Sequence, residues 1–278
     1  MTRRLDVWWI GAPARDEWAE QNRWLRRHAD VRVLEGLGEV CEMLGRGSSA
    51  DLLVVARGRP GEIAPAEIDT LRRLAPLLPI VQLAGSWCEG ELRSGRPWRA
   101  AERVYWHQAV QQWRADLLRH EIGLTPDWML PLTTTDDERL LARLATPTST
   151  SGGPLPPEKR VVMAAGSYAM RQWIAEGARF RGFHPILWQD LESPMPATQI
   201  VAGLWDGNSL AARADREART SLADFVRQLA PVPVVALLSF PRIDDLEEAR
   251  NAGARQVISK PCMIEDLFSC LGDVIESV

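Results

Sequence analysis

Short, continuously apolar segments alternate with amphipathic segments along the whole chain. Apolar segments without polar alternation are typical of parallel strands that are buried on both faces. The predicted strands are Val7–Ile10, Val31–Leu34, Leu52–Val55, Ile80–Leu83, Arg103–Trp106, Arg160–Ala165, His184–Trp188, Gln199–Leu204, Val232–Phe240 and Gln256–Ser259. The predicted helices are Asp16–Arg27, Glu39–Leu44, Pro65–Leu74, Val110–Glu121, Ser167–Arg181, Arg216–Leu229, Asp244–Ala252 and Ile264–Ile275. This order predicts an α/β protein with helices on both faces of parallel sheets.

The pattern runs through the same order twice, which predicts two domains. Residues 146–158 are polar, rich in proline and glycine, and without periodicity, as in an interdomain linker. Just before them, an acidic start at Asp136 and leucines at positions 140, 141 and 144 predict a short helix. We therefore predict a domain over residues 1–125, a short helix and linker over 126–158, and a second domain over 159–278. The repeat unit is too long for a solenoid, so a domain duplication is expected.

The composition fits two globular domains. The chain has 278 residues, of which 46% are hydrophobic and 25% charged, enough to build a core in each half. The net charge of −4 gives no basic footprint, so nucleic-acid binding is not expected. No apolar run approaches the ~20 residues of a membrane span, and the N-terminal sequence has no cleavage-site pattern. These features predict a cytoplasmic protein without a membrane partner.

The chain shows no motif of catalysis, metal binding or cofactor binding. The cysteines form no C-x-x-C pair and no histidine stands at ligand spacing from them: Cys41, Cys88, Cys262 and Cys270. No glycine-rich phosphate-binding motif follows a strand, and no Ser or Cys lies in a nucleophile-elbow pattern. We therefore expect a protein that is not an enzyme and that holds no metal and no cofactor.

One segment near the C-terminus resembles a known family. It reads Ala-Gly-Ala at 252–254, then the predicted strand Gln256–Ser259, then Lys260-Pro261, followed by a terminal helix. This resembles the end of the receiver domain of bacterial response regulators, the phosphorylated domain of two-component signalling. The resemblance implies a doubly wound, flavodoxin-like (βα)5 fold for each half, with a parallel five-stranded sheet. It also implies that Lys260 faces the phosphoryl site and that its bond to Pro261 is cis.

The same resemblance implies that the first domain lacks the family's acidic site. Its third strand and following loop, residues 50–61, resemble the phosphoacceptor segment of a receiver, with Ala56 at the acceptor position. The paired acids that hold Mg²⁺ are replaced by Gly11 and Ala12. The hydroxyl position falls on Ala84 and the lysine position on His107. The first domain is thus expected to be a pseudo-receiver.

The second domain keeps more of the expected residues. The acid positions fall on Ala165 and Gly166, and the hydroxyl position falls on Leu238 with Ser239 next to it. The sequence places Gly203 at the acceptor position, and Asp206 follows in the sequence Asp-Gly-Asn. This tripeptide is interpreted as a turn. Lys260 is then expected to be vestigial, paired with Asp206 or with a backbone carbonyl.

Tryptophan is unusually frequent, with 12 Trp against 2 Tyr and 5 Phe. Residues 85–98 are interrupted by three glycines and a proline, which predicts a poor helix where a receiver has its fourth. In receivers that side of the domain carries dimerisation or output contacts. The predicted interface residues are Trp87, Trp98, Trp106 and Trp113. Packing in the core is the alternative for these side chains.

These features together predict a non-catalytic signalling or regulatory protein. Its two pseudo-receiver domains are expected to bind protein partners, a second copy of the chain among them. Two alternatives remain open. One is a phosphorylatable switch that uses Asp206 and Lys260, and the other is a small-molecule sensor or enzyme at the carboxyl edge of a sheet.

Overall fold

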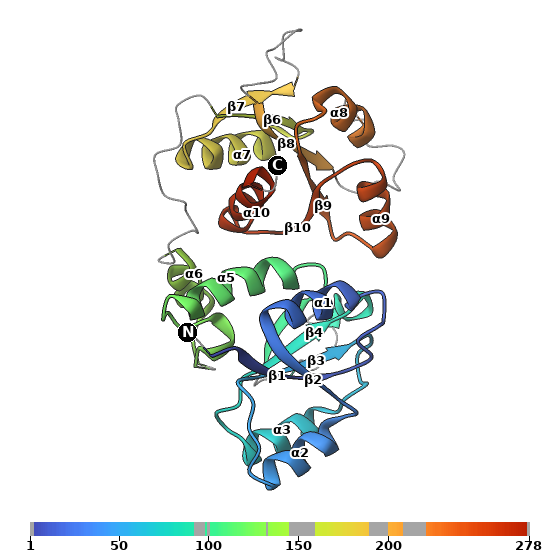
Figure 1. Ribbon diagram of the computed structural model, residues 1–278, viewed down its shortest axis with the longest axis vertical. Coiled ribbons are helices and arrows are strands. Elements are labelled where there is room, and N and C mark those ends of the chain that lie inside the picture. The colour runs from blue at the N-terminus through green and yellow to red at the C-terminus, as the bar shows by residue number, and fades with distance from the viewer. Residues whose placement is uncertain are drawn as a thin grey trace. The chain divides into compact units, whose positions relative to one another are not determined.

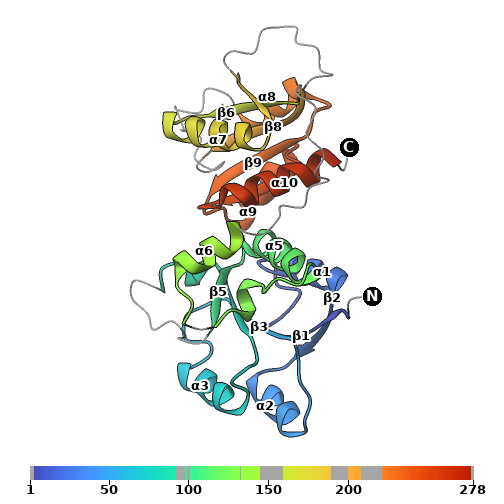
Figure 2. The same cartoon turned by 90° about the vertical axis from the view of Figure 1, so that its left-hand side faces the viewer.

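The computed structural model describes residues 3–91, 98, 101–131, 133–144, 159–188, 200–207 and 221–276. The chain divides into two compact units, Met1–Thr146 and Pro147–Val278 (Figures 1 and 2). Each unit contains one five-stranded sheet in which all neighbouring strands are parallel.

The first unit is a doubly wound sheet with the order β2-β1-β3-β4-β5. Its strands are β1 (Leu5–Ile10), β2 (Ala29–Leu34), β3 (Leu52–Arg57), β4 (Ile80–Ala84) and β5 (Glu102–Tyr105). Its helices are α1 (Ala19–His28), α2 (Leu37–Gly45), α3 (Pro65–Leu74), α5 (Ala109–Glu121) and α6 (Asp136–Leu144), with short 3-10 turns η1 (Ser86–Cys88) and η2 (Asp127–Met129). Helices α2 and α3 cover one face of the sheet, and α1 and α5 cover the other (Figure 1).

The second unit repeats this topology with the order β7-β6-β8-β9-β10. Its strands are β6 (Arg160–Ala165), β7 (His184–Leu187), β8 (Ile200–Gly207), β9 (Val234–Ser239) and β10 (Gln256–Lys260). Its helices are α7 (Tyr168–Phe180), α8 (Leu222–Leu229), α9 (Ile243–Asn251) and α10 (Ile264–Glu276). Helices α7 and α10 pack on one face, and α8 and α9 pack on the other.

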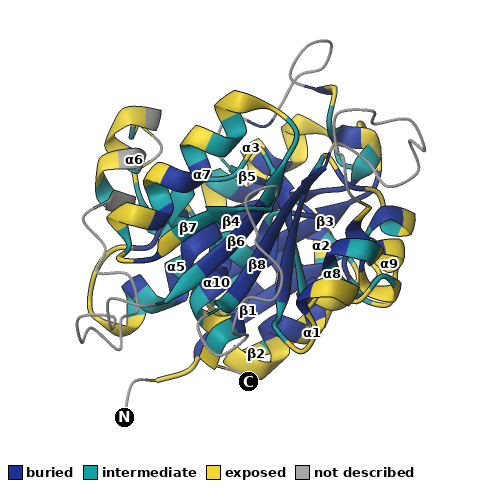
Figure 3. Cartoon of the chain, turned by 90° about the horizontal axis from the view of Figure 1, so that it is seen from above, coloured by how far each residue is buried: buried dark blue, intermediate teal, exposed yellow. Residues whose placement is uncertain are grey.

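The central strands explain why each sheet is covered on both sides. Every residue of β3 is buried, and β8 is buried from Ala202 onward (Figure 3). Strands that bury both faces need helices on both faces, which the crossover helices supply. The strand order is that of flavodoxin-like folds, in which the order reverses next to the first strand. The predicted fold class is therefore confirmed for both halves.

Two predicted helix starts are wrong. Helix α1 begins at Ala19 rather than Asp16, because residues 12–18 form turns, with the Ala12 carbonyl accepting from the Arg15 amide. Helix α8 begins at Leu222 rather than Arg216. The hydroxyl of Ser221 accepts from the Asp224 amide and caps the first turn, so the helix does not extend further back. Residues 208–220 lie outside the described part of the chain.

The first unit is longer than the predicted domain 1–125. Asp127 and Trp128 are buried, and the guanidinium of Arg119 on α5 donates to the Asp127 carboxylate at 2.6 Å. The segment after α5 is thus packed in the first unit instead of belonging to the connection. The predicted short helix is confirmed as α6, whereas the predicted linker 146–158 falls on residues that the structure does not describe. Among the described residues no helix has the length and apolar character that crossing a bilayer requires.

Candidate functional site

Doubly wound sheets bind ligands at the carboxyl ends of their strands, so a functional site is expected at this edge of each sheet. In the first unit, this edge is formed by small side chains. Gly11 directly follows β1 with φ +108°, and a Cβ there would lie 2.5 Å from the carbonyl oxygen of Ala56. Only glycine fits this conformation and this close approach. Gly11, Ala12, Ala56 and Ala84 place no carboxylate side chain at the edge.

A carboxylate reaches this edge from the loop after β1. The buried Glu17 accepts a hydrogen bond from the Ser86 amide at 2.8 Å, and its other oxygen lies 3.0 Å from Nε of Arg15. The Arg15 guanidinium stacks on Trp18, 4.8 Å from the ring centroid. The indole N–H of Trp18 in turn donates to the carbonyl of Ala12. The sequence-based prediction did not include this pair, because nothing local to residues 15–17 indicates contact with residue 86.

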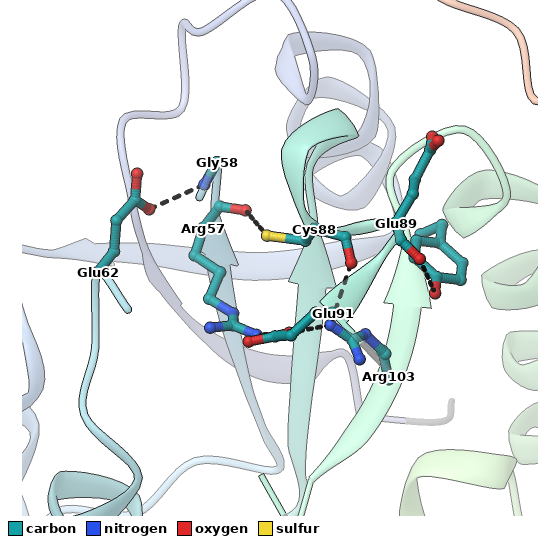
Figure 4. Close-up of polar contacts among 8 residues, drawn as sticks. Arg57, Gly58, Glu62, Cys88, Glu89, Glu91 and Arg103 are labelled. Carbon is teal, nitrogen blue, oxygen red and sulfur yellow. Dashed lines mark hydrogen bonds and ion pairs between the residues drawn. The ribbon is translucent and has the colours of Figure 1, made fainter. Parts of the chain in front are cut away.

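A second charged group lies between β3 and β5 (Figure 4). The Glu91 carboxylate forms ion pairs with the guanidinium groups of both Arg57 and Arg103. Arg57 is only 2% exposed and also stacks on Trp98, 4.7 Å from the ring centroid. One carboxylate thus holds the guanidinium groups of Arg57, the last residue of β3, and of Arg103, which lies inside β5 level with Gln82. The signal in the sequence is Arg57 itself, a charged residue in an apolar strand.

Two further contacts connect this cluster to the loops. The Glu62 carboxylate accepts from the Gly58 amide at 2.8 Å, and the Cys88 thiol lies 3.7 Å from the Arg57 carbonyl oxygen (Figure 4). Burial raises the pKa of the Cys88 thiol, and the carboxylate of Glu91 adds to this against the opposing effect of Arg57. The charged groups and loops around the end of β3 therefore contact one another within the first unit.

His107 does not lie at the lysine position. In the first sheet Tyr105 pairs with Ala84, and in the second sheet Ser259 pairs with Leu238. If Ala84 and Leu238 are corresponding positions, the residue that corresponds to Lys260 is therefore Trp106 and not His107. The first domain thus has a buried indole where the family has a lysine. The His107 side chain is fully buried next to Trp106, and burial lowers its pKa from 6.5 to about 4.

In the second unit the predicted turn is wrong. Strand β8 extends to Gly207, so Asp206 and Gly207 lie in a strand that pairs with both β6 and β9. Asn208 lies outside the described residues. Asp206 is buried, and its carboxylate forms an ion pair with the ammonium group of Lys260 at the end of β10. The sequence left Lys260 with two candidate partners, and the structure pairs it with Asp206.

Asp206, and not Gly203, corresponds to Ala56. Ile10 pairs with Val55, which brings Gly11 level with Ala56. In the second unit Ala165, the counterpart of Gly11, pairs directly with Asp206. Both positions also have leucine partners in the next strand, Leu83 and Leu237.

Gly203 lies within the strand instead. A Cβ there would lie 2.6 Å from a methyl carbon of Leu229 and 2.9 Å from the ring of Phe225. It is therefore a packing glycine beneath α8. The prediction that Gly203 occupies the acceptor position is wrong, because the strand is longer than the sequence indicated.

The remaining predicted residues of this edge gather around Lys260. Ser239 ends β9 and pairs with Lys260, and the peptide bond between Lys260 and Pro261 is cis, as the resemblance implies. Burial raises the pKa of the neighbouring Cys262 thiol to about 12, and the Asp266 carboxylate contributes to this shift. Ala165 and Gly166 end β6 without a carboxylate side chain.

Only one of the four predicted interface tryptophans lies at the surface. Trp87 is 69% exposed, whereas Trp98, Trp106 and Trp113 are 6%, 2% and 1% exposed. The predicted shared surface is therefore wrong, and the alternative of core packing holds for three of the four. An indole in an irregular segment gives no sequence signal of its direction, because it fits both a core and an interface.

Three acidic side chains that the sequence did not single out lie together near η2. Carboxylate oxygens of Glu102, Asp116 and Asp127 are all within 4.8 Å of one another. Arg119 donates to Asp127, whose amide donates to the Asp116 carboxylate at 2.7 Å. A guanidinium group thus supplies positive charge to the cluster, and its contacts fix η2 against α5.

Comparison with known proteins finds similar solved structures at low sequence identity. No protein-family model matches the chain, and no curated protein matches it. Solved structures that are similar include a receiver domain from Clostridium thermocellum, with 16% identity, a TM-score of 0.33, and coverage of 43% of this chain and 95% of that chain. A response regulator from Thermotoga maritima has 16% identity, a TM-score of 0.34, and coverage of 42% and 98%. A receiver protein from Burkholderia phymatum has 19% identity, a TM-score of 0.35, and coverage of 42% and 95%.

Each of these alignments covers less than half of this chain. The assignment of both units to the flavodoxin-like class rests on their strand order.

Proposed function

We propose that this protein is a non-catalytic regulatory module whose two pseudo-receiver domains bind protein partners. The observation that carries the proposal is the set of residues at or directly after the carboxyl end of the first strand of each unit. Gly11 and Ala12 in one unit, and Ala165 and Gly166 in the other, offer no carboxylate to a divalent cation. Phosphoryl transfer to an aspartate in this fold needs such a cation to neutralise charge.

An exposed aromatic side chain at the edge of each sheet supports partner binding. Trp87 stacks with the guanidinium of Arg59, 5.6 Å from the ring centroid, at the carboxyl edge of the first sheet. Phe240 follows β9 in the second unit and is 55% exposed. Its φ of 44° is a strained conformation for a bulky residue, which is typical of functional positions. Aromatic and arginine side chains are the usual anchors of protein contacts.

A second candidate function is supported by the pairing of β8. Asp206 lies level with Ala165, at the position of a phosphoacceptor, and Lys260 contacts it. These are two of the residues that a phosphorylated receiver uses. The second domain as a phosphorylatable switch is therefore the competing proposal.

One experiment separates the two candidates. The intact mass of the full chain is measured after incubation with acetyl phosphate and Mg²⁺, with Asp206→Ala as the matched variant. We expect no added phosphoryl group in either protein. A phosphoryl group on the unmodified chain that is absent from Asp206→Ala would overturn the non-catalytic proposal and support the switch.

Binding to a second copy is tested with Trp87→Ala. Sedimentation over a wide range of concentration is expected to show weaker self-association for this variant. Leu77→Ala is the control, because Leu77 is also an exposed apolar side chain of the first unit, at 92%. Equal association of both variants with the unmodified chain would exclude Trp87 from a homodimer contact.

A further inference from the structure

The Glu17 carboxylate lies where a ligand of this fold would bind. Its Oε1 accepts from the Ser86 amide in the loop after β4, at 2.8 Å. A Cβ on Gly85 would lie 3.0 Å from both carboxylate oxygens, so the carboxylate rests directly on the backbone at the end of β4. Residue 85 must be small for the carboxylate to reach this place.

Arg15 completes the surroundings of this carboxylate. Its Nε lies 3.0 Å from the second oxygen of Glu17, and its side chain is held over the ring of Trp18. A Cβ on Gly58 would lie 2.1 Å from the Arg15 guanidinium, which therefore crosses the backbone at the end of β3. Two glycines on neighbouring strand ends thus leave room for this one ion pair.

Burial of the carboxylate distinguishes this pair from an ordinary surface salt bridge, although the Arg15 side chain is 39% exposed. The Glu17 side chain is 8% exposed, although it comes from a loop at the edge of the domain. A carboxylate at such a depth is stable only with donors and positive charge around it. Oε1 accepts a hydrogen bond from the Ser86 amide, whereas Oε2 accepts none and is balanced by the charge of the Arg15 guanidinium. A backbone amide together with a cationic group binds anions, and the carboxyl edge of the sheet is the ligand-binding edge.

We propose that Glu17 is an internal anionic ligand of the first domain. The Ser86 amide and the Arg15 guanidinium form a small anion site at the ends of β3 and β4, and the domain's own carboxylate fills it. This inference rests on the proposed pseudo-receiver function and adds the reason why the first domain is independent of an external anion. The contact between the Glu17 carboxylate and the Ser86 amide keeps the loop after β1 fixed to the segment after β4.

Chemical rescue tests the proposal. In Glu17→Ala the carboxylate is removed while Arg15 and the Ser86 amide remain, so acetate can enter the vacated site. Thermal unfolding of the full chain is followed by tryptophan fluorescence, since most of the tryptophans lie in the first unit. Acetate is compared with chloride at equal ionic strength. Asp16→Ala is the control, because Asp16 directly precedes Glu17 in the sequence and its side chain is exposed.

We expect Glu17→Ala to have a lower Tm than the unmodified chain, and acetate to raise it by about 3 °C or more over chloride. The unmodified chain, Asp16→Ala and the isosteric Glu17→Gln should show no acetate-specific rise, because in each of them the site stays filled. If Glu17→Ala does not fold in chloride, recovery of its native fluorescence in acetate is the supporting result.

Two results would overturn the anion site. One is a Glu17→Ala protein that does not respond specifically to acetate, whether it is folded in chloride or has to be refolded in acetate. The other is an equal response of Glu17→Gln, which would place the acetate elsewhere. Neither result affects the proposed function, which is tested separately by phosphoryl uptake and by the Trp87 variant.

Discussion

Lys260 and Asp206 form an ion pair although their strands are not neighbours in the sheet, since β9 lies between β8 and β10. The pair therefore spans the carboxyl end of β9 and connects three strands of the second unit. Both side chains are mostly buried, at 15% exposure for Lys260 and 7% for Asp206. A contact of this kind is costly to break from one side, because the remaining charge loses its partner without regaining water.

Asp206→Ala is expected to lower the free energy of unfolding by about 2–4 kcal/mol, because it leaves the Lys260 ammonium group without its carboxylate. Adding Lys260→Met to this variant should restore at least about 1 kcal/mol, since the stranded charge is then removed as well. Urea unfolding of the two single variants and the double variant measures the coupling. Strictly additive losses would show that the pair contributes nothing as a pair.

Gly203→Ala is expected to cost about 1–3 kcal/mol, because the new methyl group would lie 2.6 Å from Leu229 and 2.9 Å from Phe225. Gly272 is the matched control in the same unit. It lies inside α10 and a Cβ there meets nothing within 4 Å, so Gly272→Ala should stabilise by about 0.5–1 kcal/mol. Urea unfolding compares the two. A harmless Gly203→Ala would contradict the tight packing of β8 beneath α8.

The sequence pattern predicted where the strands lie, but it placed the end of β8 at Leu204 instead of Gly207. The central strands β3 and β4 are dense apolar runs, and burial on both faces makes such a run recognisable without its neighbours. Asp206 and Gly207 are typical turn residues, so local propensity ended the strand at Leu204. Pairing with Leu237 and Leu238 of β9 overrides that propensity, and such pairing is not visible in a local window.

The site residues missed by the sequence show the same limit. Glu17 contacts Ser86 across 69 positions, and Glu91 contacts Arg57 across 34. Such pairs depend on which loops meet at the edge of the sheet, which follows from the strand order and not from spacing. Residues at the end of a clearly apolar strand, such as Gly11 and Lys260, could be predicted, whereas Gly203 and His107 were assigned wrongly because the local pattern misplaced the strand end. The partners of the loop residues could not be predicted.

Glu91→Gln is expected to lower the free energy of unfolding of the first unit by about 3–5 kcal/mol. The neutral amide would leave the Arg57 and Arg103 guanidinium groups close together without a compensating charge, and their side chains are only 2% and 12% exposed. Guanidinium chloride unfolding measures the loss.

Glu62→Gln is the control for this variant, because the Glu62 carboxylate accepts from the Gly58 amide and the amide oxygen of Gln can still do so. Its loss should be clearly smaller. Equal losses for the two variants would mean that the charge of Glu91 does not matter and that the cluster is held by shape alone.

His107 is expected to make the first unit sensitive to acid. Burial lowers its pKa from 6.5 to about 4, so between these values the unfolded chain binds a proton that the folded chain does not. The free energy of unfolding must therefore fall as the pH is lowered from 6.5 to 4, by up to about 3 kcal/mol, and this contribution is fully present above pH 6.5. His107→Gln carries no titrating group, so its disadvantage relative to the unmodified chain should shrink over the same pH range. Urea unfolding at a series of pH values measures this difference, and a difference that stays constant across the range would show that the folded protein does not keep His107 neutral.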